Sequence, residues 1–190
     1  MASSAGEQTG LAPQAVQTLQ TDRLILRSWC DDDAPALFEL ARNPRVGPAA
    51  GWQPHANVEE SRQIIRDVLA APQSFAAVRR VDGALVGCFG LKPASASDVA
   101  SAGEAELGYW LGVPFWGQGL ATEAARELVR YGFDELGLSA IWACYYDGNE
   151  RSHRVMEKLG MTYMGSKECD VPLLGERRLE HCMRLVHDAQ

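Results

Sequence analysis

Two glycines with one residue between them, Gly117 and Gly119, lie between a stretch typical of a β-strand, residues 104–111, and a helical pattern that begins at Leu120. The first amides of a helix have no acceptor within the helix, and their dipoles add to its positive end. Glycines let a phosphate group approach those amides closely, and the Thr122 hydroxyl can add a hydrogen bond. The pattern predicts a phosphate site, although glycines before a helix more often serve only to turn the chain.

A second segment, Asn149 to Met161, begins at a turn and continues as an amphipathic helix. Together the two segments resemble the GNAT acetyltransferase superfamily, in particular its RimJ/RimL-like branch. The family's acetyl-CoA pattern aligns on Trp116, Gly119 and Ala121. Trp116 departs from the Gln or Arg of the general pattern, but an aromatic residue is common there in this branch. The resemblance covers about residues 19–186.

The resemblance implies that acetyl-CoA is the cosubstrate and that backbone amides bind its diphosphate. Its pantetheine arm would lie like an added strand beside residues 104–111, because free N–H and C=O groups of a strand edge pair with an extended chain that carries amides. An amide of the same stretch would polarise the thioester carbonyl. The residues that the resemblance assigns to acetyl-CoA are Leu111, Gly112, Val113, Gly117, Gln118, Gly119, Leu120, Ala121, Thr122, Asn149 and Ser152.

Two residues are candidates for proton transfer. Attack by an amine requires its neutral form, so a nearby carboxylate that accepts a proton assists the reaction. Glu106 resembles in position the strand glutamate often proposed as the base in relatives, although a strand glutamate can also face solvent without a role. Many relatives protonate the departing thiolate with a tyrosine, but Met156 occupies that position and cannot donate a proton. Ser152 is the alternative donor, although its hydroxyl could instead satisfy a free amide at the helix N-terminus. Asn149 could be only a turn residue or a cap, but the resemblance implies that it contacts the cofactor.

The acceptor pocket has a weaker signal in the sequence. We expect His153 and His181 to be surface or packing residues, because they lack the spacing of metal ligands. Five aromatic side chains could line the pocket or could belong to the core, namely Trp52, His55, Tyr109, Tyr145 and Tyr146.

Composition excludes several classes of function. The formal net charge of −7 disfavours a nucleic-acid partner, since phosphate binding needs clustered Lys and Arg. No apolar stretch of about 20 residues and no leader is evident, so we expect a cytoplasmic protein without a membrane partner. The five cysteines form no Cys-x-x-Cys pair, and we therefore expect reduced thiols and no metal. A homodimer remains an open alternative.

We expect a tail at residues 1–18 and one domain at residues 19–188, with an irregular stretch at 43–56. The resemblance implies an α/β (α+β) GNAT fold, a mixed, mostly antiparallel sheet of six to seven strands flanked by about four helices and splayed after strand four. Hydrophobic periodicity and turn signals predict strands at 24–29, 75–81, 84–92, 104–111, 140–146, 162–168 and 178–186, and helices at 31–42, 58–71, 120–136 and 149–159.

The hypothesis that follows is an N-acetyltransferase. It would transfer acetyl from acetyl-CoA to a primary amine, either a protein N-terminal α-amine or a small-molecule amine, by direct attack in a ternary complex. The alternative is a catalytically silent acetyl-CoA-binding sensor or interaction module with the same fold. A phosphate-binding NTPase is disfavoured, because the sequence contains no Gly-x-x-x-x-Gly-Lys-Ser/Thr pattern.

Overall fold

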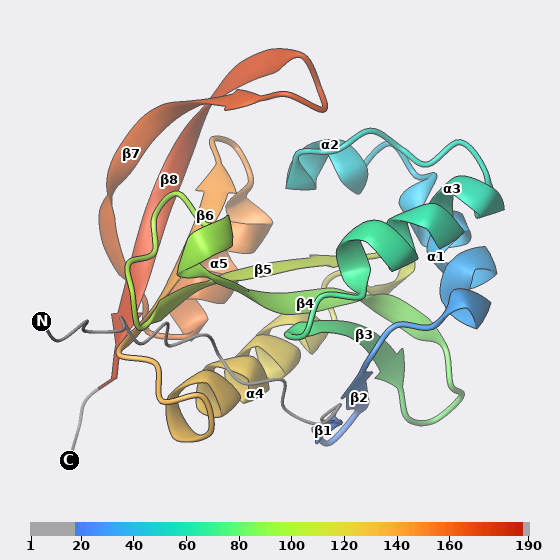
Figure 1. Cartoon of the computed structure of the whole chain (residues 1–190), viewed down its shortest axis with the longest axis horizontal. Helices are drawn as coiled ribbons and strands as arrows, with labels where there is room; N and C mark the ends of the chain where they lie inside the picture. Colours follow the sequence, from blue (N-terminus) through green and yellow to red (C-terminus); the bar gives the residue numbers. More distant parts are fainter. Residues whose placement is uncertain (1–17, 188–190) are drawn as a thin grey trace, which may run out of the picture.

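An eight-stranded sheet with helices on both faces forms the protein (Figure 1). The computed structural model describes residues 18–187, so all but the last residue of the expected tail lies outside the described residues. Within that range, no helix has both the length and the apolar composition needed to cross a membrane. The strands are β1 (Leu19–Gln20), β2 (Leu24–Arg27), β3 (Ser74–Arg79), β4 (Leu85–Pro93), β5 (Glu104–Leu111), β6 (Ala140–Tyr146), β7 (Thr162–Val171) and β8 (Glu176–Val186). The α-helices are α1 (Ala34–Ala41), α2 (Gly47–Ala50), α3 (Val58–Ile64), α4 (Leu120–Asp134) and α5 (Glu150–Lys158).

The strand order is β1-β2-β3-β4-β5-β6-β8-β7, and among the strands of residues 18–187 only β5 and β6 pair in parallel. Their pairing covers only three residue pairs, from Glu104 with Ala140 to Glu106 with Trp142. Beyond Glu106, β5 continues beside β4 and β6 continues beside β8, so the two strands separate. If the short β1 is left out, β5 is the fourth strand, and the predicted splay after strand four is confirmed.

Hydrophobic side chains hold the helices on the two faces. On α4, buried residues recur every three or four positions, as Leu120, Ala124, Leu128 and Tyr131, so one side of the helix packs into the main core. A second cluster, which includes Leu37, lies on the opposite face beneath α1 and α3. Figure 1 shows α4 on one side of the sheet and α1 to α3 on the other. The two layers leave the separated ends of β5 and β6 between them.

The predicted mixed, mostly antiparallel sheet is confirmed. The described residues form eight strands, where six to seven were expected, and five α-helices, where about four were expected. The extra strand is β1, whose two residues pair with β2. The extra helix α2 lies in the stretch expected to be irregular and ends at Gly51, which adopts the left-handed φ of 91° that commonly terminates helices. The helix expected at 58–71 changes at Ile65 into a π-helical turn that runs to Leu69.

Gly87 on β4 is enclosed by the backbone of β5. A Cβ atom there would lie 2.1 Å from the carbonyl oxygen of Trp110 and 2.9 Å from the Cα atom of Leu111. Because a paired strand cannot move aside as a flexible side chain can, we expect Gly87→Ala to lower the free energy of unfolding by about 2–3 kcal/mol, measured by chemical denaturation. Gly108→Ala is the control, since its Cβ would meet only the Lys92 side chain, at 3.6 Å. Equal losses in both variants would contradict this explanation.

Candidate active site

Two cavities meet where β5 and β6 separate. The first, which we call the glycine groove, has a volume of about 390 Å³. It runs past the glycine turn and the start of α5, and its lining includes Leu111, Gly117, Gly119, Leu120, Ala121, Thr122, Asn149 and Ser152. The second, the sheet groove, has a volume of about 770 Å³ and crosses the sheet face on the side of α2 and α3. Both grooves are lined by Tyr109, Trp110, Asn149 and Ser152, so the two cavities adjoin at these residues.

The glycine turn and the first turn of α4 border the glycine groove. Gly117 has a φ of 74° and Gly119 a φ of 77°, a left-handed conformation that residues with a Cβ rarely adopt. Gly119 is the residue that precedes α4, and the amides of Leu120, Ala121 and Thr122 form the first helical turn, where helix geometry provides no acceptor. All three residues line the cavity. An anion in the groove would therefore meet unpaired N–H groups and the positive end of the helix.

Arg23 fixes the glycine turn from outside the groove. Its guanidinium donates hydrogen bonds to the Gln118 carbonyl oxygen, at 2.9 Å, and to a carboxylate oxygen of Glu123, at 2.7 Å. Thr21 also donates to Glu123, at 2.5 Å. Burial raises the pKa of Glu123, but the hydrogen bonds from Thr21 and Arg23 outweigh it and hold the pKa below its usual value. This carboxylate in the first turn of α4 is thus paired with an arginine.

Trp116 occupies the first position of the glycine pattern, and its indole ring makes contacts there that stabilise the turn. Its indole Nε1 donates a hydrogen bond to the Leu111 carbonyl oxygen at 2.8 Å, which ties the turn to the end of β5. The guanidinium groups of Arg151 and Arg45 lie 4.3 Å and 4.9 Å from the ring centroid. The ring therefore holds two cations beside the glycine groove.

Three basic residues of the second motif also line the glycine groove, namely Arg151, Arg154 and Lys158. They recur at i, i+3 and i+7, a spacing that places them on one face of a helix. Our sequence reasoning did not select them, although this spacing was the available signal. Their charges add to the field of the α4 terminus and favour a ligand with several phosphates.

Three residues predicted to contact the cosubstrate do not line the cavity in the described part of the chain. The Gly112 amide donates to the Val86 carbonyl oxygen at 2.9 Å, and Val113 begins a short 3-10 helix. The Gln118 side chain donates to the Pro114 carbonyl oxygen at 2.9 Å. Since these groups bind other parts of the protein, their role toward a ligand stays a prediction.

Ser152 is held by a tyrosine at the junction of the grooves. The Tyr109 hydroxyl lies 2.9 Å from the Ser152 Oγ and donates to the Ser152 carbonyl oxygen at 3.1 Å. Burial raises the pKa of Tyr109 to about 12, so the phenol is neutral at physiological pH. Asn149 caps α5 by accepting a hydrogen bond from the Ser152 amide at 3.3 Å, while its amide group donates to the Ala49 carbonyl oxygen. The predicted cap role of Asn149 is therefore present, and both residues also border the cavities.

Glu106 lies in the sheet groove with both carboxylate oxygens hydrogen-bonded. One oxygen accepts from Lys92 Nζ at 2.9 Å and the other from Ser97 Oγ at 2.8 Å. The side chain is only 12% exposed. These partners orient the carboxylate. A proton accepted by Glu106 would bind to an oxygen that already accepts a hydrogen bond from Lys92 or Ser97.

Glu180 is a second carboxylate in the sheet groove, and our sequence reasoning did not select it. It lies on β8, and Lys167 Nζ is 3.6 Å from one of its oxygens. Burial raises its pKa, and the negative charges of Asp98 and Glu106 act in the same direction against Lys167. No local motif marks this residue, because only the pairing of β8 with β6 brings it to the groove.

The aromatic residues expected near an acceptor separate into two groups. Trp52, Tyr109, Tyr145 and Tyr146 line the sheet groove. His55 is buried against Ser61 instead, at 2.8 Å, and burial lowers its pKa. His153 and His181 stack on Tyr145 with ring centroids 4.8 Å and 4.9 Å away, respectively, in agreement with the packing role expected of them.

Comparisons with known proteins identify the family. The acetyltransferase (GNAT) domain model matches residues 23–162, which is more than half of the chain. YoaA of Bacillus subtilis, an N-acetyltransferase named as uncharacterized, is 33% identical over 152 residues, which cover 77% of this chain and 84% of YoaA. A GNAT-family acetyltransferase from Bacillus anthracis superposes with a TM-score of 0.77 at 24% identity, and the match covers 90% of this chain and 98% of that one. The chain belongs to the GNAT acetyltransferase family, so the predicted enzyme class is confirmed.

A further relative connects the chain to the RimJ/RimL-like branch. YdaF of Bacillus subtilis, named as a candidate ribosomal N-acetyltransferase, is 42% identical over 62 residues, which cover 33% of this chain and 34% of YdaF. Members of the family use acetyl-CoA as the donor of the acetyl group. The free amides, the glycine turn and the basic residues of the glycine groove fit the phosphates of that molecule.

Gly119 provides a test of the phosphate site. An Ala Cβ at its φ of 77° is strained, and relief of that strain would turn the free amides away from the groove. We expect Gly119→Ala to weaken coenzyme A binding at least roughly tenfold, measured by calorimetry. Gly137→Ala is the matched control, because Gly137 has a φ of 66° just beyond the other end of α4 and does not line the groove. Similar affinities in the two variants would count against the site.

Proposed function

We propose that this chain transfers the acetyl group of acetyl-CoA to a primary amine by direct attack in a ternary complex. The observation that carries the proposal is the junction of the two grooves at Tyr109, Trp110, Asn149 and Ser152. A donor bound in the glycine groove and an amine bound in the sheet groove would meet there. Neither substrate would have to leave its cavity for the reaction to occur.

The donor would be held by backbone and by charge. The amides of Leu120, Ala121 and Thr122 would bind the diphosphate, and Arg151, Arg154 and Lys158 would face its remaining phosphate groups. The pantetheine arm would extend between β5 and β6, along the edge of β5 that lacks a strand partner beyond Glu106. In this arrangement the thioester would lie near the junction.

The amine would approach through the sheet groove as an ammonium and must lose a proton before it attacks. At pH 7, about one α-amino group in ten is neutral, against roughly one lysine amine in 2,500. Glu106 and Glu180 both line the groove, so two carboxylates are available to attract the cation and to accept its proton. We assign the role of base to Glu106, directly or through water.

The departing group would be stabilised by Ser152. When the amine nitrogen bonds to the acyl carbon, the carbon–sulfur bond breaks and the sulfur leaves as a thiolate. The Ser152 hydroxyl can donate a hydrogen bond or a proton to that sulfur, and Tyr109 holds the hydroxyl in position at 2.9 Å. A thiol with a pKa of about 8.5 is also a tolerable leaving group on its own, so the expected contribution is moderate.

The acceptor that we favour is a protein N-terminal α-amine, with small-molecule amines as the second class. An α-amine is less basic than a lysine amine, so a larger fraction of it is neutral at pH 7 and it depends less on a catalytic base. The name of YdaF points in the same direction for that relative. A panel of N-terminal peptides, polyamines and amino acids, assayed for release of free coenzyme A thiol, tests the proposal. Binding of acetyl-CoA with no thiol release above background for any amine would instead support the silent acetyl-CoA-binding module.

Glu106→Gln tests the base. The amide cannot accept the proton, so we expect turnover to fall roughly 100-fold, with acetyl-CoA affinity near that of the parent protein. The acidic limb of the pH–rate profile, which reports the base, should be lost. Glu104→Gln is the control, because Glu104 lies two residues earlier on β5 and bonds to Trp142 outside the sheet groove. An unchanged pH–rate profile in Glu106→Gln would retire the assignment.

A double-mutant cycle tests whether Tyr109 acts through Ser152. We expect Ser152→Ala to lower kcat roughly tenfold to 100-fold and Tyr109→Phe to lower it less, because the phenylalanine leaves the serine present but unfixed. If the tyrosine only positions the serine, the double variant should be no slower than Ser152→Ala. Additive losses in steady-state kcat would show that Tyr109 contacts the reacting atoms itself.

A further inference from the structure

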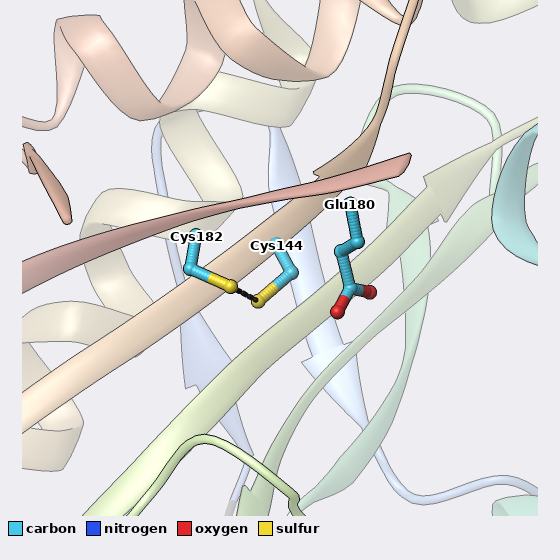
Figure 2. A group of neighbouring side chains, drawn as sticks. All are labelled: Cys144, Glu180 and Cys182. Carbon is cyan, nitrogen blue, oxygen red and sulfur yellow. Dashed lines mark hydrogen bonds between the residues drawn. The ribbon is translucent and has the colours of Figure 1, made fainter. Parts of the chain in front are cut away.

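Two thiols and a carboxylate converge in the wall of the sheet groove. Cys144 and Cys182 are direct partners in the antiparallel pairing of β6 with β8, and their Sγ atoms are 3.3 Å apart. Glu180 lies two residues before Cys182, so its side chain is on the same face of the sheet. The two sulfurs and a carboxylate oxygen of Glu180 all lie within 4.8 Å of one another (Figure 2).

We propose that Cys144, Glu180 and Cys182 form a binding site for one divalent cation of the zinc class. Zinc bonds to thiolate at about 2.3 Å, so two thiolates of a tetrahedral site lie about 3.8 Å apart. The observed 3.3 Å between the sulfurs requires only a small change in side-chain torsion. Two sulfur ligands select zinc and related thiophilic ions, whereas magnesium and calcium take oxygen ligands.

The groove gives the cation a route of entry and a free coordination position. Cys144 and Glu180 both line the cavity, so an ion can reach them from solvent. Three protein ligands leave a fourth position, which water can fill from the groove side.

Charge and protons balance without an oxidant. Each thiol releases one proton as its sulfur binds the cation, so two protons enter solvent. Two thiolates and one carboxylate carry three negative charges, of which the cation neutralises two. Lys167, which is also ion-paired with Asp98, lies 3.6 Å from Glu180 and reduces the effect of the third. Sequence spacing could not reveal this site, because 37 residues separate Cys144 from Cys182 and only strand pairing unites them.

A functional consequence rests on the proposed function. A cation bound here occupies the wall of the groove that we assign to the amine, whereas the residues of the glycine groove are untouched. Zinc should therefore inhibit transfer competitively with the amine and leave the affinity for acetyl-CoA unchanged.

The experiment uses the full chain, reduced with a phosphine and titrated with Co²⁺ as a spectroscopic probe. We expect a thiolate-to-cobalt charge-transfer band that saturates at one ion per chain and disappears when Zn²⁺ displaces the cobalt. Cys144→Ser and Cys182→Ser should each abolish the band, and Glu180→Gln should weaken binding roughly 10- to 100-fold. Cys88→Ser is the control, since Cys88 lines the same groove outside the cluster. Circular dichroism establishes that each variant is folded.

Absence of the charge-transfer band in the parent protein, or its persistence in both cysteine variants, would overturn the site. Failure of the reduced protein to bind cobalt, together with formation of a Cys144–Cys182 disulfide by dissolved oxygen once the phosphine is removed, seen as a loss of two hydrogens by mass spectrometry, would do the same. The spectroscopic readout needs no turnover. Failure of the acetyltransferase proposal would therefore leave this test intact, and a metal site without inhibition would contradict only the competition with the amine.

Discussion

The parallel pairing of β5 with β6 ends at Glu106 and Trp142, and the geometry of both grooves depends on that end point. Each strand keeps a partner on its other side, so neither loses its place in the sheet when the two separate. The facing edges then carry N–H and C=O groups without strand partners, which need a partner from solvent or a ligand. An extended chain with amides satisfies them as a further strand would. Tyr109, on the part of β5 that no longer pairs with β6, hydrogen-bonds Ser152 of α5.

The glycine turn is a second constraint, because it must hold an anion site open. Left-handed glycines alone make a flexible turn, since glycine has many other conformations available. Arg23 removes that freedom by bonding to the Gln118 carbonyl oxygen and to Glu123, while the Trp116 indole ties the turn to Leu111. The Arg23 and Trp116 side chains therefore hold the turn from two sides. Preorganisation of this kind lowers the entropy that a ligand must overcome.

The sequence was most informative where a structure is determined by neighbouring residues. β5 and β6 begin and end where periodicity predicts, and α4 begins directly after Gly119. By contrast, the contacts of Tyr109 with Ser152 and of Cys144 with Cys182 depend on which strands pair and where they separate. Long-range pairing of this kind has no local signature. The basic residues on α5 were visible as a helical spacing, but their role depends on the direction that this helix face takes in the fold.

Charge is distributed unevenly between the two grooves of a protein whose net charge is negative. Arg151, Arg154 and Lys158 line the glycine groove, whereas Glu106 and Glu180 line the sheet groove. In the function that we propose, this distribution would direct a polyanionic donor and a cationic amine to different cavities. Acetylation then removes the charge of the amine, because an amide is neutral at all ordinary pH values. The attraction that would bring the acceptor to the carboxylates would thus be absent from the product, which would favour its release from the sheet groove.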